Sequence, residues 1–510
     1  MPIAKILSGT VVGLDPFPIE VEVNIDNQGF PAFNIVGLAS KEVDEAKERV
    51  RSAIKNCNFK FPDKRITVNL APADLPKRGS AFDLPIAIGV LLADKQLDFD
   101  PSKSVFIGEL SLDGNLRHTT SVLPVTLMAK ERDLRHVFLP SANAKEASIV
   151  SGVYVRPVEN LKDIYYHFSG AKIIYTAKPL SFDEILTQNV DYEFDFSEVR
   201  GQELVKRALQ IAAAGSHNIA MKGPPGAGKT MLARCLPSIL PDLTSKEALE
   251  VTKIYSISGN LDPESPIIRT RPFRSPHHTT SRTGLIGGST NLTPGEISLA
   301  HRGVLFLDEF AELPRHVLEA LRQPVEDGCV NISRAAGSIK FPSKFMLVVA
   351  YNPCPCGYLG DPKKECICSP QQILRYKKRI SGPILDRIDI HIEVPAVDTE
   401  KLISTRPSKS SKEVKAKVQE ARAIQLKRFK NLNITSNSEM KPKEIKEFCV
   451  LKPAVLDLLR HAVNQMGLSA RGYFRILKVS RTIADLENAE EIDINHVSEA
   501  LSFRSREDRI

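Results

Sequence analysis

The chain has 510 residues, which is more than one ordinary hydrophobic core and indicates two to four domains. Hydrophobic residues make up 42% and charged residues 25%, as in soluble globular proteins, and no apolar run approaches the roughly 18 residues that cross a bilayer. The 69 Lys and Arg residues exceed the 61 Asp and Glu residues, which permits a nucleic-acid partner without requiring one. The amino terminus is typical of neither a signal peptide nor an anchor, so we expect a cytoplasmic protein without a membrane partner.

The first part of the chain, residues 1–168, mixes strand-like and helix-like stretches. The runs IEVEVNI, RITVNLA and SVFIGEL have the composition of strands, whereas DEAKERVRSAIKN and DLPIAIGVLLADKQ space their apolar residues as helices do. This mixture predicts an α+β domain. Residues 169–195 are less regular, and we expect them to link this domain to the next one.

From residue 196 to residue 397, apolar strand-like runs alternate with helix-like segments. The runs NIAMKG, VLFLDEF, FMLVVAYN and IHIEVPA are candidate strands, and their alternation with helices predicts a parallel sheet covered on both faces. Residues 398–510 have a mainly helical pattern, as in KPAVLDLLRHAVNQM. The sequence therefore predicts a multidomain α/β fold in which a helical lid follows the parallel sheet.

A phosphate-binding motif lies between the first of these strands and a helix. GPPGAGKT, residues 223–230, fits G-x-x-x-x-G-K-[ST] and has the flanking strand and helix that this motif needs. Its glycines let backbone N–H groups surround phosphates, Lys229 would reach the β- and γ-phosphates, and the start of the helix favours an anion. The residues that we expect to bind the nucleotide are Gly223, Pro224, Pro225, Gly226, Ala227, Gly228, Lys229, Thr230 and Met231.

Polar residues end the next two candidate strands. At the end of VLFLDEF, Asp308 is suited to hold Mg²⁺ together with Thr230, and Glu309 is suited to polarise the attacking water. Asn352 ends FMLVVAYN, where ring-forming ATPases have a polar side chain that contacts the γ-phosphate or the water. These residues predict an NTPase with ATP and Mg²⁺ as its cofactors.

Two arginines suit the catalytic machinery of a ring. Arg387 lies in an LDR turn before IHIEVPA and can face the nucleotide of a neighbouring subunit, although a structural salt bridge to Asp386 or Asp389 is the alternative. Arg471 begins a helix of the predicted lid and suits a second nucleotide sensor, with Arg475 as the alternative.

Four of the eight cysteines lie within the 15 residues from Cys354 to Cys368, in two C-x-C pairs. One tight cluster in a chain of cytosolic character favours a metal over disulfides. Cys354, Cys356, Cys366 and Cys368 could bind a structural Zn²⁺ tetrahedrally. Reduced cysteines in an ordinary loop and an iron–sulfur cluster are the alternatives.

Long runs of the sequence are similar to a single family. RPFRSPHHTTS, PGEISLAHRGVLFLDEF, LRQPVEDG, NPCPCG and SGPILDRIDIHIEV resemble the ComM/YifB family, the magnesium-chelatase-like AAA+ ATPases. PAFNIVGLASKEVDEAKERVRSAI and VNLAPADLPKRGSAFDLPIAIG in the first part of the chain also fit, so the resemblance covers nearly the whole chain. PHHTTS and NPCPCG are far more specific than a phosphate-binding motif alone.

The resemblance implies three parts: a domain similar to the Lon protease domain (1–168), an AAA+ core (196–397) with an extra helix-2 insertion at about 271–300, and a helical lid (398–510). Members related to ComM look like hexameric DNA motors that drive branch migration during natural transformation, whereas chelatase relatives remodel a partner enzyme. We therefore expect a hexameric ATPase that acts on DNA, with recombination proteins as candidate partners. A chelatase- or chaperone-type ATPase that remodels a protein is the alternative.

The expected helix-2 insertion contains the glycine-rich run TGLIGGSTNLTPGE, which would face the pore of a ring. Arg271, Arg274 and Arg282 could contact a DNA backbone there, or they could stabilise subunit contacts. His277 and His278 are adjacent and would face opposite ways in an extended chain, which favours hydrogen-bonded structure over a metal pair.

The similarity to the Lon protease domain does not extend to its catalytic pair, a serine activated by a lysine. Matching DLPIA puts Ala81 at the position of the nucleophile, and only a shift by one residue would place Ser80 there. In GELSLDGNLRHTTSVLPV, Leu123 takes the position of the lysine. We therefore expect a binding or assembly module rather than an active protease.

Overall fold

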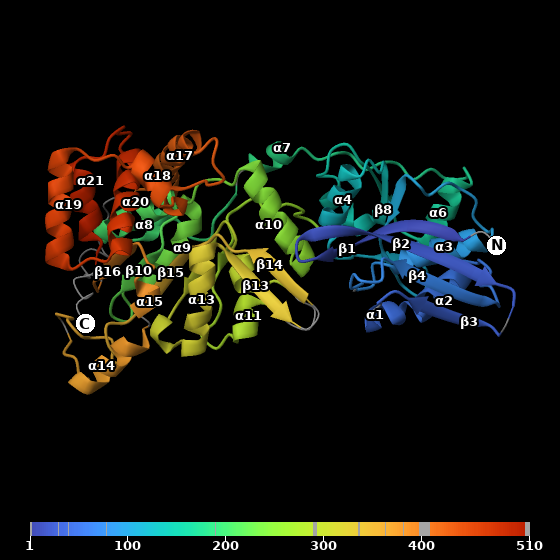
Figure 1. Ribbon diagram of the computed structural model, residues 1–510, viewed down its shortest axis with the longest axis horizontal. Coiled ribbons are helices and arrows are strands. Elements are labelled where there is room, and N and C mark those ends of the chain that lie inside the picture. Colours follow the sequence, from blue (N-terminus) through green and yellow to red (C-terminus); the bar gives the residue numbers. More distant parts are fainter. Residues whose placement is uncertain are drawn as a thin grey trace.

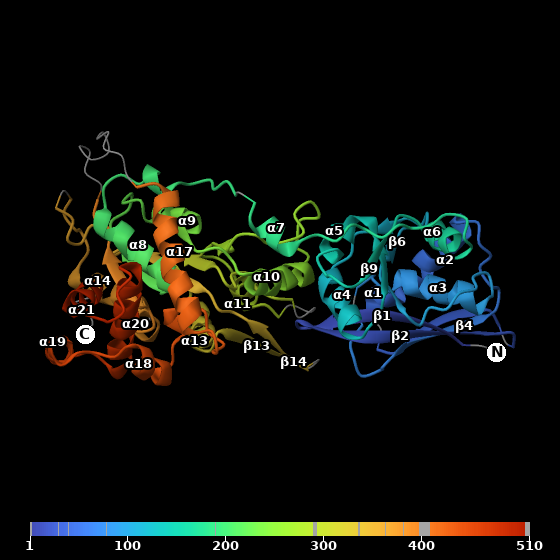
Figure 2. The same ribbon diagram turned by 90° about the horizontal axis from the view of Figure 1, so that it is seen from above.

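The computed structural model describes residues 3–28, 30–38, 40–77, 79–188, 190–288, 293–334, 337–362, 364–380, 382–396 and 409–504. Part of the glycine-rich run that we expected to face a pore, and the domain boundary that we expected at residues 397 and 398, lie outside these ranges. Two α/β bodies follow one another along the long axis, and the C-terminal helices lie at the end far from the amino terminus (Figure 1, Figure 2).

The amino-terminal body is built on a mixed seven-stranded sheet of the order β3-β4-β2-β1-β5-β8-β9. β2 pairs antiparallel with β1 and with β4, and the other neighbours pair in parallel. The strands are β1 (Ala4–Val12), β2 (Asp15–Asp26), β3 (Ala32–Val36), β4 (Arg65–Ala71), β5 (Ser104–Phe106), β8 (His136–Pro140) and β9 (Tyr154–Val158). The predicted mixture of strands and helices is therefore present.

Helices cover both faces of this sheet. Phe106 of β5 belongs to a core with α2 and α3, whereas its neighbour Val105 belongs to a second core with α4, because successive strand residues point to opposite faces. The remaining elements of this part are α1 (Lys41–Asp44), α2 (Ala46–Asn56), α3 (Asp83–Ala93), β6 (Glu109–Leu110), β7 (Leu116–Arg117), α4 (Val122–Glu131), α5 (Ala144–Ala147), α6 (Leu161–Phe168) and α7 (Phe182–Leu186).

The second body contains a five-stranded sheet of the order β11-β12-β15-β10-β16, in which all pairs are parallel. Its strands are β10 (Ile219–Lys222), β11 (Phe273–Arg274), β12 (Val304–Leu307), β15 (Met346–Tyr351) and β16 (Ile390–Glu393). The expected parallel sheet is confirmed. The strand that the sequence did not reveal is β11, since two residues are too few to show a strand pattern.

Both faces of this parallel sheet are buried. Ile219 and Met221 of β10 share a core with α8 (Glu203–Gly215), α9 (Lys229–Ile239) and the C-terminal helices. Ala220, between them, belongs to the core on the other face, together with residues of α13 (Arg315–Asp327). This double burial explains why the strands are continuous apolar runs rather than alternating ones.

A hairpin that the sequence did not predict follows α13 and touches the amino-terminal body. It consists of β13 (Cys329–Arg334) and β14 (Gly337–Pro342), which pair antiparallel. The turn between β1 and β2 packs on it so closely that a Cβ on Gly13 would lie 2.6 Å from Cγ2 of Ile339. The β13–β14 hairpin therefore lies between the two bodies (Figure 1).

A second contact between the bodies is made by α10 (Ser245–Ser258). The hydroxyl of Ser256 donates to Oε1 of Glu146 over 2.5 Å, and its carbonyl accepts from the N–H of Ser121. Burial raises the pKa of Glu146, while hydrogen bonds from Ser256 and Asn143 act in the opposite direction. A buried acid that receives such donors holds the two bodies in a specific relative position.

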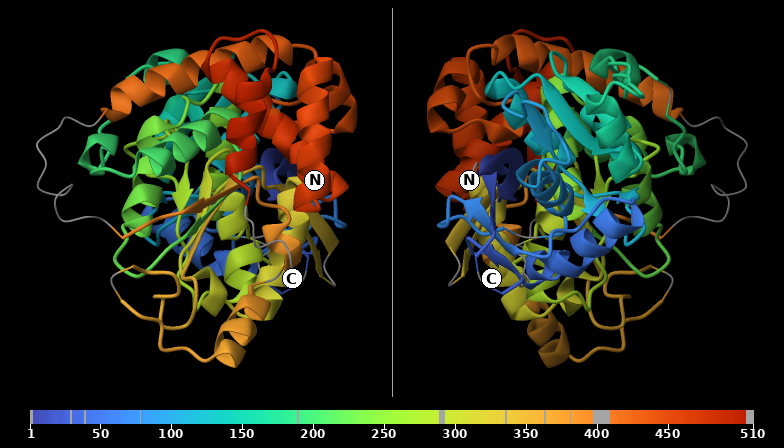
Figure 3. Two further views of the ribbon diagram at one scale, coloured as in Figure 1. Left: turned by 90° about the vertical axis from the view of Figure 1, so that its left-hand side faces the viewer. Right: turned by 90° about the vertical axis from the view of Figure 1, so that its right-hand side faces the viewer.

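The C-terminal helices pack directly on the parallel sheet body (Figure 3). They are α17 (Ser411–Arg428), α18 (Pro442–Phe448), α19 (Pro453–Met466), α20 (Ala470–Leu486) and α21 (Ile494–Ser502). Fully buried Asp485 of α20 joins α20 to α17, since its carboxylate accepts from Arg428 of α17 as well as from Arg481 of its own helix. Residues of α17 and α20 share one core with β10 and β15, so these helices pack directly against the strands of the parallel sheet.

No helix in the described ranges combines the length and the apolar composition that a membrane-spanning segment requires.

Candidate nucleotide-binding site

The phosphate loop, residues 223–230, connects the carboxyl end of β10 to the first turn of α9. Gly226 and Gly228 have φ angles of +75° and +83°, which glycine adopts without strain. The N–H of Gly223 donates to the carbonyl of Tyr351 at the end of β15, and Gln202 donates to the carbonyl of Ala227. The loop is therefore fixed from two sides, with the amino terminus of α9 directed at the place where phosphates would bind.

Lys229 folds back over the phosphate loop. Its Nζ donates to the carbonyls of Gly223 (2.8 Å) and Pro224 (2.9 Å) and to Oδ1 of Asn352 (3.1 Å). Burial lowers the pKa of Lys229, and the charge of Asp308 partly opposes that shift. The structure thus brings Lys229 and Asn352 together, although 123 positions separate them in the sequence.

Asp308 follows β12 and meets the first turn of α9. The hydroxyl of Thr230 donates to Oδ2 of Asp308 over 2.6 Å. A hydroxyl and a carboxylate are oxygen ligands of the kind that Mg²⁺ accepts, so the residues present fit this ion. β10, β12 and β15 are parallel, and their carboxyl ends therefore place the phosphate loop, Asp308 and Asn352 at one edge of the sheet.

Glu309, the candidate base, contacts His278, a residue that we did not expect at the nucleotide site. Glu309 has a left-handed backbone (φ 48°), and one of its carboxylate oxygens lies 3.1 Å from Nδ1 of His278. His278 follows β11, which pairs with β12, so both residues leave neighbouring strands at the same edge. Recognising β11 in the sequence would have revealed this pair.

The expectation that His277 and His278 face opposite ways is wrong. Their ring centroids are 4.1 Å apart. The chain turns here instead of running extended, since the N–H of Thr280 donates to the carbonyl of His277. The ring of His277 contacts the hydroxyl of Thr279, also within this turn.

Arg387 lies at the opposite edge of the sheet. Its carbonyl accepts from the side chain of Asn218, which precedes β10, whereas the phosphate loop follows β10. Its guanidinium lies 2.8 Å from Oε1 of Glu326, on α13. Arg387 is therefore separated from the phosphate loop of its own chain by the length of a strand.

Arg471 lies beside Arg387 at this edge. Its guanidinium contacts Glu326 (3.3 Å) and Asp386 (3.9 Å), and its side chain is 59% exposed. Arg475, the alternative candidate for the second sensor, is partly buried and pairs with Asp389 (3.2 Å). The structure therefore places Arg471 next to Arg387, at the edge opposite Lys229. Arg475 packs against Asp389 within the same edge.

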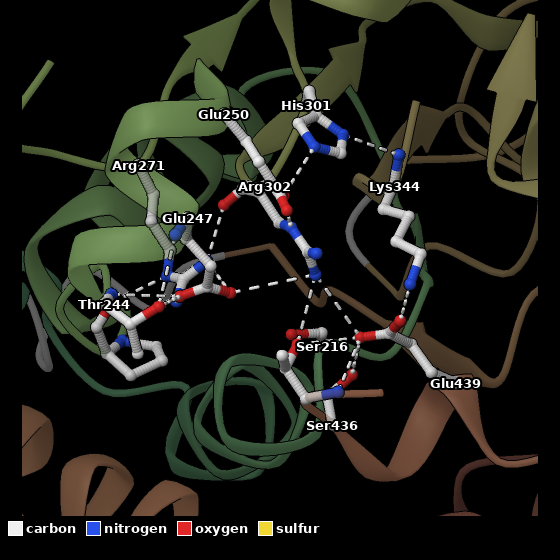
Figure 4. A network of polar contacts seen from close by, with 12 residues as sticks. Ser216, Thr244, Glu247, Glu250, Arg271, His301, Arg302, Lys344, Ser436 and Glu439 are labelled. Atoms are coloured by element: carbon white, nitrogen blue, oxygen red, sulfur yellow. Dashed lines mark hydrogen bonds and ion pairs between the residues drawn. The ribbon is translucent and has the colours of Figure 1, made fainter. Parts of the chain in front are cut away.

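Two of the three arginines considered for DNA contact are engaged inside the chain. Arg271 pairs with buried Glu247 (2.9 Å) and donates to the carbonyl of Arg302 (2.7 Å), as Figure 4 shows. Burial by itself raises the pKa of Glu247, but the charges of Arg271 and Arg302 outweigh it and lower that pKa to about 2. Arg274 pairs with Glu296 (2.6 Å). Arg282, at the start of α11 (Arg282–Ile286), is exposed.

The four clustered cysteines converge. The sulfur of Cys354 lies 3.4 Å from that of Cys356 and 3.6 Å from that of Cys366, and all four sulfurs, including that of Cys368, lie within 4.8 Å of one another. Sulfurs held about 2.3 Å from a tetrahedral Zn²⁺ lie about 3.8 Å apart. The cluster fits such an ion. Among the described residues, it is the group of three or more His, Cys, Asp or Glu side chains whose ligand atoms lie close enough together to hold a metal.

In the amino-terminal body, the residues weighed for proteolysis are in different surroundings. The hydroxyl of Ser80 donates to Glu109, and Ala81 packs at the edge of the core that contains α4. Leu123 is fully buried in that core, and its N–H donates to Glu146.

An all-parallel sheet with the phosphate loop, Asp308, Glu309 and Asn352 at its carboxyl edge defines a P-loop nucleoside triphosphatase of the AAA+ class. The family model of magnesium chelatase, subunit ChlI, matches residues 195–402, that of subunit ChlI of Mg-chelatase matches 21–143, and the ChlI C-terminal model matches 408–504.

The relatives identify the family within this class. The chain is 45% identical over 508 residues to competence protein ComM of Haemophilus influenzae, covering 99% of this chain and 98% of the relative. It is 41% identical to the uncharacterized protein YifB of Escherichia coli over 99% of this chain and 97% of the relative. The magnesium-chelatase 38 kDa subunit of Rhodobacter capsulatus is 26% identical over 62% of this chain and 89% of its own length. The chain belongs to the ComM/YifB family of magnesium-chelatase-like AAA+ proteins.

The contact of His278 with Glu309 predicts a restraint on ATP turnover. A carboxylate oxygen paired with an imidazole is not free to polarise water, so His278→Ala is expected to raise turnover without added partner by up to about fivefold, the factor that corresponds to ~1 kcal/mol, the upper end for an exposed ion pair. Steady-state phosphate release measures this rate. His277→Ala is the matched control, because it removes the neighbouring ring, whose nitrogen contacts Thr279, and leaves the contact of His278 with Glu309 in place. A fall in turnover on His278→Ala would contradict the prediction.

Proposed function

We propose that the protein is an ATP-hydrolysing, ring-forming motor that acts on DNA, driving branch migration or strand separation in recombination or natural transformation. The observation that carries this proposal is that the chain combines a complete candidate nucleotide site with similarity to a competence protein over its full length. In this function Lys229 and Thr230 bind Mg²⁺·ATP, Asp308 helps to hold the ion, and Glu309 activates water. The bound ion and nucleotide supply the electrophilic phosphoryl group.

The two edges of the parallel sheet support the proposal of a ring. Arg387 and Arg471 lie at the amino edge, opposite the phosphate loop, where they would meet the nucleotide of the adjacent subunit. A head-to-tail contact of this kind closes into a ring when its rotation closes. We propose a hexamer in which residues 398–510 act as a lid and residues 1–168 act as a Lon-like binding or assembly module.

The proposed DNA contacts involve cations that the fold leaves exposed. Arg282 at the start of α11 and Lys340 on β14 are both exposed. In the sequence, α11 lies between strands β11 and β12 of the parallel sheet, and β14 lies between strands β12 and β15. Such cations can neutralise phosphates without reading sequence. Arg271 and Arg274 are assigned to internal ion pairs, and we do not include them in this surface.

The DNA function predicts that a four-way junction stimulates ATP turnover of the full-length protein at least about threefold, because DNA binding shifts the motor to its active state. Phosphate release is measured with and without the junction, and Glu309→Gln, which removes the base, should lower both rates by about 10²-fold. Turnover that ignores all DNA forms in a preparation with confirmed rings would favour the alternative, a chelatase- or chaperone-type ATPase that remodels a protein.

The ring predicts complementation between inactive variants. Lys229→Ala lacks a working phosphate loop and Arg387→Ala lacks the arginine supplied to the neighbour, so each alone should be inactive. In an equal mixture, about a quarter of the interfaces would combine an intact loop with an intact arginine and restore that share of turnover. The activity of mixtures prepared by dissociation and reassembly measures this. No recovery in mixed rings would refute the assignment of Arg387.

We also propose that Cys354, Cys356, Cys366 and Cys368 bind a structural Zn²⁺. The protein is expected to contain about one zinc ion per chain after purification under reducing conditions, as determined by elemental analysis. Cys354→Ser combined with Cys366→Ser should abolish it. Cys449→Ser, which changes a buried cysteine outside the cluster, is the control. If the purified protein contains stoichiometric iron and sulfide, the four cysteines bind an iron–sulfur cluster and the assignment of zinc is wrong.

A further inference from the structure

The cysteine loop, residues 354–368, touches the phosphate loop. It begins two residues after Asn352, whose Oδ1 accepts from Lys229. Gly357 lies against Pro225, so closely that an added Cβ would be 2.5 Å from Cδ of Pro225 and 3.7 Å from Cγ of Asn352. The cysteine loop therefore continues directly from Asn352 and also packs on Pro225 of the phosphate loop.

The other end of the cysteine loop supports the segment that follows Glu309. Directly after Cys368, Ser369 caps α14 (Pro370–Arg379) by accepting from the N–H of Gln372. Tyr376 of α14 is buried in the same core as Phe310, and Arg379 lies 3.4 Å from Glu312. Thus one end of the loop carries Asn352 and the other end carries a helix that packs next to the candidate base.

The thiols hold these two ends together. Within the described part of the loop, the backbone hydrogen bonds are short-range, from Gly357 to the carbonyl of Cys354 and from Asp361 to that of Tyr358. Contacts between the beginning and the end of the loop are made by sulfur, as when the N–H of Cys356 donates to Cys368. Closing a loop of this length costs conformational entropy, which a metal bound to four thiolates offsets.

We propose that a metal ion bound by Cys354, Cys356, Cys366 and Cys368 braces the nucleotide site, so that metal binding and nucleotide binding strengthen each other. This inference rests on the zinc site proposed above. The metal closes the loop, and the closed loop presses Gly357 on Pro225 and positions Asn352 beside Lys229. Because coupling between two sites is reciprocal, bound nucleotide must increase the affinity for the metal by the same factor.

The full-length protein tests this reciprocity without an activity assay. Zinc affinity is measured by equilibrium competition with a chromogenic chelator, with and without Mg²⁺ and the slowly hydrolysed analogue ATPγS. The nucleotide is expected to tighten zinc binding about tenfold, within the usual range of coupling factors. In turn, removal of zinc should weaken ATPγS binding by the same factor. Equal zinc affinities in a protein shown to bind both zinc and ATPγS would overturn the inference.

Two glycine variants locate the coupling. Gly357→Ala introduces the clash with Pro225, whereas Gly360→Ala imposes a similar backbone strain (φ +82°) with no atom within 4 Å of the new Cβ. Gly357→Ala should bind one zinc per chain but lose the effect of ATPγS on zinc affinity, and Gly360→Ala should retain it. If both variants retain it, the contact with Pro225 does not transmit the coupling and the inference is wrong. A protein without bound metal would instead refute the zinc proposal itself.

Discussion

The parallel pairing of β10 with β15 and of β15 with β12 is the constraint on which the site depends. Three strands that run in one direction end at one edge, and each of them ends in a residue suited to phosphate chemistry. The phosphate loop, Asp308 and Asn352 therefore meet although they are far apart in the chain. The hydrogen bonds between the strands fix where each strand ends relative to its neighbours. The contacts of Lys229 with Asn352 and of Thr230 with Asp308 therefore follow from the strand register.

The opposite edge of the same sheet is shaped by ionic contacts. Asp389, just before β16, is buried and accepts from the N–H of Asn218 before β10. Burial by itself would raise the pKa of Asp389, but His217 and Arg475 lower it well below the usual range. A charge held in this way fixes the turn that contains Arg387. A single sheet thereby carries the candidate nucleotide site at one edge and Arg387 at the other, and the proposed head-to-tail ring relies on this asymmetry.

Many of the cations of this basic chain have internal partners. The network of Arg271, Arg302, Glu247 and Glu439 joins α10 to the segment between α17 and α18 (Figure 4), and each cation there has an acid within ion-pair distance. Removing one partner of such a buried pair leaves an uncompensated charge, which is far more costly than losing a surface pair. The net charge of the sequence is therefore a poor guide to the surface that could meet a polyanion.

The sequence by itself determined the class of fold, the phosphate loop, the acids after VLFLDEF and the cysteine cluster, because each of these is a local pattern. Alternating apolar runs specify strands and helices, and a glycine-rich turn or a C-x-C pair has the same chemistry in any fold that exposes it. The tertiary structure alone decided which groups meet. It paired His278 with Glu309 through the two-residue strand β11, and buried Arg271 against Glu247. It also set Arg471 beside Arg387 and placed Gly357 on Pro225. These contacts join residues distant in the chain, and their partners depend on strand order and helix packing, which no local pattern contains.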